Sequence, residues 1–213
     1  MAINPQKRQK KLEKRKAKQK SERRQLARRN EGGLPAKLKQ AAAAPFLHCF
    51  TTDTLWSQGM GQVLVSRQLP GGQVAFGAFL VDRYCMGVKN AFANVVPRLR
   101  YQEGMYDKLA ARDTLVPLEP ASARKLVEGA VQYALDLGIS PHPDYRVARL
   151  IFGDIEADAS TEDFEFGKDG KPLFISGPND GPARCQQILR TLENRCGHGG
   201  FHFMMPFGAM PMQ

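Results

Sequence analysis

Carboxylates at two places in this 213-residue sequence are of the residue type that metal-assisted chemistry requires. Asp82 directly follows an apolar run over residues 73–81, and Asp154, Glu156 and Asp158 occupy alternate positions of a later acidic loop. Oxygen ligands of this kind bind Mg²⁺ or Ca²⁺. If Asp82 lay close to Asp154 and Glu156, the three would form the catalytic site of a metal-dependent hydrolase or nuclease, with Asp82 as ligand or general base.

Both groups of carboxylates also have a simpler interpretation. Asp82 would end its strand by hydrogen-bonding the next turn or by pairing with Arg83. The acidic loop lacks the glycine and the terminal glutamate of a calcium-binding loop, so it would be a solvated surface segment. The distances in the fold decide between these roles, and the sequence predicts no bound metal or cofactor.

The four cysteines, Cys49, Cys85, Cys185 and Cys196, show no CxxC spacing. Each is expected to be a small buried apolar side chain, in a cytosolic protein whose thiols are reduced. Cys85 would act as a nucleophile only if Lys89 or a nearby histidine stabilised its thiolate. No feature of the sequence identifies such a partner.

The histidines offer two further candidate sites. Cys196, His198 and His202 form a loose metal-binding tract, which lacks a fourth ligand. His142 stands between two prolines, and we interpret it as an exposed loop residue rather than a ligand.

A glycine-rich turn at residues 176–182 precedes an apolar helical pattern. Free backbone N–H groups at such a helix start bind anions. The turn lacks the GxGxxG and GK[ST] patterns, and Asp180 would compete with an anion for the helix end. Asn179 or Asp180 is therefore expected to cap this helix.

Basic residues dominate the first forty positions, which carry fifteen Lys/Arg and three Glu, a balance of +12. The other residues carry sixteen basic and eighteen acidic groups, a balance of −2. Such an arm is expected to be disordered or helical, because its like charges repel in the free chain and are neutralised on a polyanion. Contacts to phosphates release counterions and give salt-sensitive, sequence-independent binding. The sequence therefore predicts a nucleic-acid-associated protein, with RNA as the expected ligand.

The predicted phosphate contacts come from thirteen side chains of the arm: Lys7, Arg8, Lys10, Lys11, Lys14, Arg15, Lys16, Lys18, Lys20, Arg23, Arg24, Arg28 and Arg29. No aromatic residue lies among them to stack on bases. The alternative is a solvated basic tail that only aids solubility. A membrane role is not expected, because the arm has no Trp, Phe or leucine cluster, no run of about 18 apolar residues exists, and no secretory signal is recognised.

The elements that must position Asp82 begin with a β-hairpin over residues 61–69 and 73–81, joined by a Pro-Gly-Gly turn. Its second strand is apolar on both faces, which is typical of a central strand covered on both sides. Gly77 would allow a helix to approach closely. Residues 46–50 are a candidate strand, and a loop or short helix is expected after Asp82.

Apolar residues at helical spacing predict helices over residues 101–112, 121–137, 144–152 and 180–195. Asp144 is the expected cap of the third helix. An Asp-Gly pair between short apolar runs at 164–167 and 172–176 predicts a second hairpin. Near the N-terminus, Leu34-Pro35 is expected to end any helix of the arm, and residues 37–45 to act as a linker.

Three segments carry a recognisable pattern: FLVDRYCMGVKNAF, PDYRVARLIFGDI and FEFGKDGKPLFISGPND. They resemble the corresponding segments of a family of uncharacterised bacterial proteins. The resemblance covers about residues 61–192 and excludes the arm and the methionine-rich tail. It implies a bacterial cytoplasmic protein, implies no reaction, and carries over no catalytic residue.

The sequence as a whole predicts one α+β domain at residues 41–196, preceded by a basic arm and linker at 1–40 and followed by a flexible Gly/Met/Phe-rich tail at 197–213. Two β-hairpins are expected to build an antiparallel sheet with packed helices. Three functions follow: nucleic-acid association through the arm, a carboxylate-dependent enzyme, or a scaffold that docks a protein partner through the tail. Whether the protein is an enzyme stays open at this point.

Overall fold

Strands β2 (Met60–Leu69) and β3 (Gln73–Asp82) form the first predicted hairpin. The computed structural model describes residues 33–177 and 180–204. The hairpin lies within a five-stranded antiparallel sheet of order β4-β3-β2-β1-β5. The other strands are β1 (Phe46–Thr52), β4 (Gly87–Pro97) and β5 (Leu115–Pro117). The predicted α+β class with an antiparallel sheet is confirmed.

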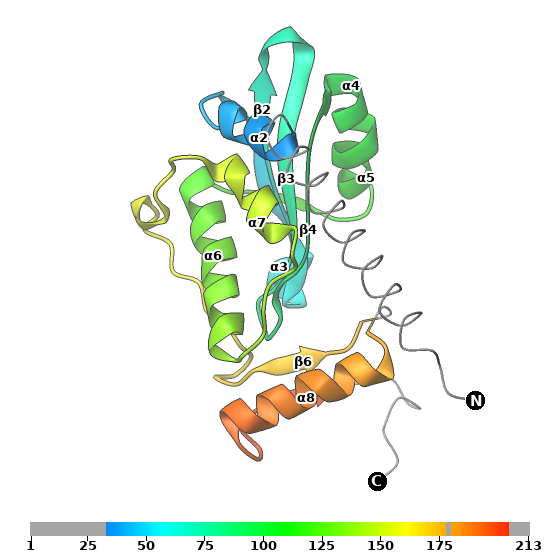
Figure 1. Ribbon diagram of the computed structural model, residues 1–213, viewed down its shortest axis with the longest axis vertical. Coiled ribbons are helices and arrows are strands. Elements are labelled where there is room, and N and C mark those ends of the chain that lie inside the picture. The colour runs from blue at the N-terminus through cyan, green and yellow to red at the C-terminus, as the bar shows by residue number, and fades with distance from the viewer. Residues whose placement is uncertain (1–32, 178–179, 205–213) are drawn as a thin grey trace, which may run out of the picture.

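Helices lie against both faces of this sheet. The helices of the described residues are α2 (Leu34–Ala41), α3 (Thr54–Ser57), α4 (Arg98–Tyr101), α5 (Asp107–Ala110), α6 (Pro120–Asp136), α7 (Tyr145–Ala148) and α8 (Pro182–Cys196). Figure 1 shows α6, α7 and α2 over one face, whereas α4 and α5 lie beside the sheet on its other side. Among the residues described, no helix has both the length and the apolar character needed to cross a membrane.

Strand β3 has no polar face because helices cover it on both sides. Phe76 packs with Tyr101 of α4, whereas Phe79 belongs to the larger cluster formed with α2, α6 and α7. A Cβ atom at Gly77 would lie 2.8 Å from Cγ2 of Ile151. The predicted central position of β3, and the close approach of a helical segment at Gly77, are both confirmed.

The residues after Asp82 form strand β4 instead of the predicted loop or short helix. Gly87 has a φ of 61° and ends a tight turn, after which β4 pairs with β3 along its whole length. Asn90 and Phe92 are exposed, and the alanines between and after them are buried. The prediction was wrong because the free edge of β3 stabilises this mixed sequence as a strand, and that edge is a tertiary feature.

Residues assigned to the arm and linker form helix α2, and this assignment was therefore wrong. Leu38 and Ala41 of α2 are buried in the main core cluster. Pro35 lies in the first turn of the helix, where its missing N–H group is not needed. The Leu34-Pro35 pair thus begins helix α2, and the folded part starts near Leu34 instead of residue 41.

The second predicted hairpin was also wrong. Lys168 and Lys171 make a single bridge across the Asp-Gly turn, and residues 164–167 form no strand. Strand β6 (Leu173–Ile175) pairs in parallel with β7 (His202–Met204). Because β7 belongs to what was predicted to be a flexible tail, the folded part extends beyond residue 196, and residues 205–213 lie outside the described chain.

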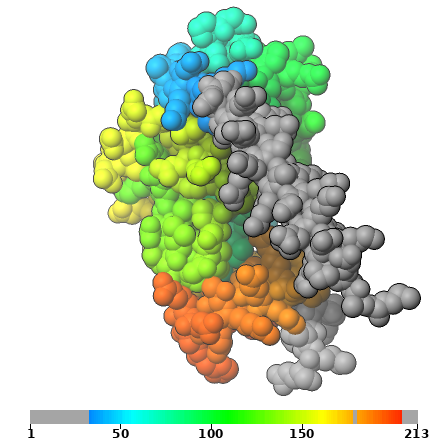
Figure 2. Space-filling model, viewed as in Figure 1, coloured from blue at the N-terminus to red at the C-terminus, as the bar shows by residue number. Residues whose placement is uncertain are grey.

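Helix α8 covers the β6–β7 ladder and closes the lower end of the molecule (Figure 1). Its predicted apolar face is confirmed, because Cys185, Ile188 and Leu192 are buried against Phe174 and the end of α6. In the space-filling view α8 and its neighbours form the base below α6 (Figure 2). The predicted domain therefore contains a second, smaller core at this end.

The remaining helices differ from the predictions mainly in continuity. The 101–112 helix is divided into α4, a π-helical turn at Gln102–Tyr106 and α5, and the 144–152 helix into α7 and a 3-10 turn at Arg149–Phe152. Asp144 occupies the predicted N-cap position of α7, but its side chain makes no capping hydrogen bond. The N-cap of α8 is Gly181 instead of Asp180, and Asn179 lies outside the described residues.

Candidate functional site

Asp82 organises the turn between β3 and β4. Its Oδ1 atom accepts hydrogen bonds from the backbone N–H groups of Tyr84 at 3.0 Å and Cys85 at 3.1 Å. The residue is only 2% exposed. Its Oδ2 atom is buried and has no hydrogen-bond partner in the part of the chain that the structure describes. Of the roles predicted for Asp82, the carboxylate that hydrogen-bonds the next turn is therefore the one that the geometry supports.

The pKa of Asp82 is raised from 3.8 to about 6. Burial is the main cause, because removal from water penalises the charged form. The positive charge of Lys89 and the backbone N–H groups of the turn act in the opposite direction and limit the increase. Asp82 is thus a buried acid that titrates close to neutral pH.

We expect the difference in stability between the natural protein and the Asp82→Asn variant to depend on pH. Below about pH 3 the natural carboxyl is largely neutral in both the folded and the unfolded chain. As pH rises from about 3 to about 7, the unfolded chain ionises first, and the natural protein should lose about 3 kcal/mol of unfolding free energy relative to the variant. Asparagine keeps an oxygen that accepts the two turn N–H groups.

Urea denaturation at several pH values between about 3 and about 7 measures this difference. Asp169→Asn, at an exposed turn, is the matched control and should give a nearly constant difference from the natural protein. Parallel pH curves for the two variants would show that Asp82 does not have the raised pKa.

The sheet register separates Asp82 from Asp154. Asp82 is opposite Met60 at one end of β2, and Arg67 lies near the other end of the same strand, about 20 Å away. Arg67 donates hydrogen bonds to the backbone oxygens of Ile151 and Phe152, immediately before the acidic loop. The two carboxylates therefore lie toward opposite ends of the sheet.

Glu156 is also remote from Asp82, as α6 shows. Arg124, near the start of α6, donates to the backbone oxygen of Ile155. The turn after Asp82 packs instead near the other end of α6, since a Cβ atom at Gly87 would touch the oxygen of Ala130. Across the described residues, no group of three or more His, Cys, Asp or Glu side chains could hold a metal ion. Asp82 therefore lies apart from Asp154 and Glu156, and the site that a carboxylate-dependent enzyme would require is not formed by these three residues.

Cys85 does not have the properties of a nucleophile. Burial raises the pKa of its thiol to about 12, and the nearby Asp82 and Cys196 add to the increase. Lys89 acts in the opposite direction but does not outweigh these effects. Burial likewise raises the pKa of Cys49 to about 12. Both cysteines are consistent with the predicted role of apolar packing groups.

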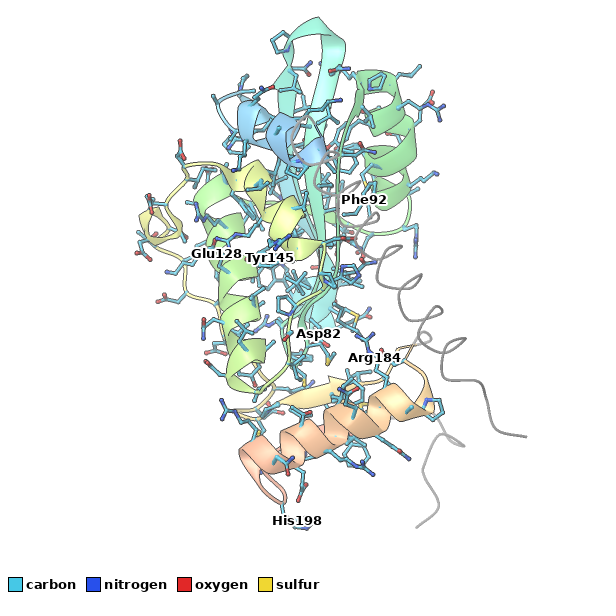
Figure 3. The ribbon with its side chains drawn as sticks, in the orientation of Figure 1. Asp82, Phe92, Glu128, Tyr145, Arg184 and His198 are labelled. Atoms are coloured by element: carbon cyan, nitrogen blue, oxygen red, sulfur yellow. The ribbon has the colours of Figure 1, made fainter. Side chains whose placement is uncertain are left out.

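A cavity of about 250 Å³ lies where β4, the loop at residues 140–143 and α8 meet. Its lining consists of Met86, Val88, Lys89, Ser140, Pro141, His142, Pro143 and Arg184. Figure 3 shows Asp82 and Arg184 at this lower end of the molecule, between the sheet and α8. The cavity therefore lies near Asp82, but the lining comes from residues that are far apart in the sequence.

Asp180 joins two cations of the cavity. Its Oδ2 atom lies 3.1 Å from Nζ of Lys89, and its Oδ1 atom lies 3.3 Å from Nε of Arg184. The backbone N–H of Gly177 also donates to Oδ2, at 2.9 Å. Burial alone would raise the pKa of Asp180, but the Gly177 hydrogen bond and the two cations outweigh it and hold the pKa below its usual value. Asp180 is therefore ionised at neutral pH.

The sequence analysis identified this region only in part. It considered backbone anion binding at the 176–182 turn and expected Asp180 to compete with an anion there, and in the structure the Asp180 side chain accepts the Gly177 N–H group. It considered Lys89 only as a partner of Cys85, treated His142 as a loop residue, and did not consider Ser140 or Arg184. Lys89 and Asp180 are 91 positions apart, so no local pattern could predict their contact.

A second polar cluster, missed by the sequence analysis, lies between the sheet and α4. The hydroxyl of Tyr101 donates to Oγ of Ser66 at 3.0 Å and lies 2.9 Å from Nδ1 of His48. Burial, aided by the charge of Arg98, lowers the pKa of His48. Because Ser66 and Tyr101 are fully buried, a substrate has no access to them, and the cluster satisfies polar groups of the core.

The thirteen basic residues predicted to contact phosphates all lie outside the described residues. His198 and His202, in the predicted metal-binding tract, are exposed, and His198 lies 3.5 Å from the carboxylate of Glu193.

Comparison with protein-family models, with curated proteins and with solved structures found no match for this chain.

Proposed function

We propose that this protein is a nucleic-acid-associated binding protein, with RNA as the expected ligand and the basic N-terminal residues as the source of affinity. The supporting observation is the distribution of charge about the start of the folded part. The 32 residues before Gly33 carry thirteen Lys/Arg and three Glu. Residues 33–213 carry eighteen basic and eighteen acidic groups. The net positive charge of the protein therefore comes from the segment that precedes α2, because the basic and acidic groups of the other residues balance.

Such a segment binds through phosphates rather than bases. Each neutralised phosphate releases condensed counterions, and no aromatic side chain lies in the segment to stack on a base. Binding should therefore depend steeply on salt and little on nucleotide sequence. The proposal includes a cytoplasmic location, which is consistent with the four free cysteines.

The test is the dissociation constant for single-stranded RNA and for DNA, measured at several salt concentrations. If between half and all of the thirteen side chains contact phosphates, the logarithm of the association constant (the reciprocal of the dissociation constant) should fall with log salt on single-stranded RNA, with a slope between about −4 and −9. An arm variant with six glutamines should lose roughly half of that slope. Its substitutions are at Lys10, Lys11, Lys14, Arg15, Lys16 and Lys18.

The matched control removes six exposed positive charges from the folded part. They are Lys39, Arg100, Lys108, Arg112, Arg146 and Arg190, each replaced by glutamine. This body variant should bind RNA nearly as tightly as the natural protein does. Equal losses in the two variants would mean that overall charge, rather than the N-terminal segment, determines binding. No binding by the natural protein at low salt would disprove the proposed function.

A further inference from the structure

We propose that the cavity between β4, the 140–143 loop and α8 is a binding site for a phosphate group. This inference concerns the folded part of the protein and does not depend on the basic N-terminal segment. It rests on the chemistry of the lining, on the residual charge behind it, and on its size. The Asp180 carboxylate lies behind the two cations instead of in the lining.

Two cations with unused donors line the cavity. Lys89 has three N–H donors, and its ion pair with Asp180 uses one of them. Arg184 contacts Asp180 through Nε, and its two terminal nitrogens make no hydrogen bond to any other described residue. The Arg184 side chain is 57% exposed, which allows a ligand to reach it. Asp180 faces two permanent positive charges, and a net charge of about +1 remains for an anion while Asp82 is protonated. Above the Asp82 pKa of about 6, the ionised Asp82 carboxylate reduces the positive charge that Lys89 offers.

The 140–143 loop adds two neutral donors. Nδ1 of His142 accepts the backbone N–H of Asp144 at 3.3 Å, so we assign the proton of the neutral imidazole to Nε2, which is then a donor. Ser140 also lines the cavity, and its side chain carries a hydroxyl that can act as the second donor. The backbone N–H of His142 donates to the oxygen of Val88 at 2.9 Å and attaches the loop to β4. Prolines on both sides of His142 restrict the loop before a ligand binds.

Among the described residues, no acidic side chain belongs to the cavity lining, whose ionisable groups are Lys89, His142 and Arg184. The hydrogen-bond donors come from a strand, a loop and a helix, so they reach a ligand from several directions. They match an acceptor whose oxygens also point in several directions. A phosphate monoester has three such oxygens, whereas a carboxylate has two in one plane. A volume of about 250 Å³ is below the range of about 300–1,000 Å³ for drug-sized ligands. The site therefore fits a single phosphate group, either free or at the end of a larger molecule.

The test uses inorganic phosphate and the full chain, with binding measured by calorimetry at constant ionic strength in chloride. Arg184→Gln should weaken phosphate binding by about tenfold, and Ser140→Ala by a few fold. Arg190→Gln, on the exposed side of the same helix, is the charge-matched control and should bind phosphate as the natural protein does. Lys89 is left unchanged because it is the more buried of the two partners of Asp180, at 10% exposure against 57% for Arg184, and its removal would destabilise the buried carboxylate.

Three results would overturn the proposal. The first is equal phosphate affinity for Arg184→Gln and Arg190→Gln. The second is a loss of phosphate binding in the six-glutamine arm variant but not in Arg184→Gln, which would assign binding to the N-terminal segment. The third is acetate binding as tightly as phosphate. Each of these outcomes is independent of the RNA measurement, so failure of this site and failure of the proposed function are distinguishable.

Two sources of the phosphate group can be separated with the same variants. If the natural ligand is a nucleic-acid end, a 5′-phosphorylated oligonucleotide should bind more tightly than its 5′-hydroxyl form, and Arg184→Gln should abolish the difference. If the ligand is a small phosphorylated molecule, inorganic phosphate and a mononucleotide should bind while the two oligonucleotides bind equally. Either result supports the phosphate site.

Discussion

Replacement of Arg67 by alanine is expected to lower the unfolding free energy by about 4 kcal/mol. Arg67 is 4% exposed and donates to three backbone oxygens, those of Ile151 at 2.9 Å, Phe152 at 2.9 Å and Ala44 at 2.6 Å. Its guanidinium also lies 3.8 Å from the ring centre of Phe46. Loss of the side chain would leave buried carbonyl groups without donors, and each such group costs about 1–3 kcal/mol.

Chemical denaturation at pH 7 measures this loss. Arg98→Ala is the control, because Arg98 makes an exposed hydrogen bond to Gln68 and should contribute less than about 1 kcal/mol. Arg67→Lys should be intermediate, since an ammonium group cannot reproduce the planar fork of a guanidinium. Similar losses for Arg67→Ala and Arg98→Ala would contradict the role assigned to Arg67 as a buried connection between β2 and the 149–152 turn.

Two N-terminal deletions should have very different effects on stability. A chain that begins at Gly33 keeps α2, and its unfolding free energy should lie within about 1 kcal/mol of that of the full chain. A chain that begins at Ala42 loses α2, including Leu38, which is fully buried, and the partly buried Leu34. Because truncation of a buried leucine alone costs about 2–5 kcal/mol, this second deletion should lose at least about 4 kcal/mol.

The measurement is urea denaturation of both shortened chains beside the full chain. Leu38→Ala in the full chain provides an independent check and should lose about 3 kcal/mol. If the chain from Ala42 is as stable as the chain from Gly33, then α2 is not part of the core. The same comparison sets the boundary for RNA-binding experiments, because a deletion at residue 41 would remove core residues together with the basic segment.

The sequence by itself determined the elements whose signals are local. The Pro-Gly-Gly turn between two apolar runs defines the β2–β3 hairpin, since few residues other than glycine adopt the required backbone conformation. Helices α6 and α8 follow from apolar residues at helical spacing, with a proline at the start of each. The buried position of β3 follows from its lack of a polar face.

The tertiary structure alone decided which elements pair. β4 has a mixed sequence and becomes a strand because β3 offers it a free edge, and β6 pairs with β7 instead of with the preceding run at 164–167. The Asp-Gly signal was present at residues 169–170, but only one bridge forms around it. Pairing energy comes from backbone groups of a partner strand, which no local pattern of the sequence reports.

The candidate site shows the same division. Asp82, at the end of an apolar strand, could be identified from the sequence, but its separation from Asp154 and Glu156 depends on the sheet register and the packing of α6. Lys89 and Arg184 have no sequence pattern in common, and Asp180 brings them to one cavity. The sequence therefore determined residue types, local elements and the charge of the N-terminal segment. The relative positions of distant side chains were decided only by the fold, because they depend on strand pairing and helix packing between remote segments.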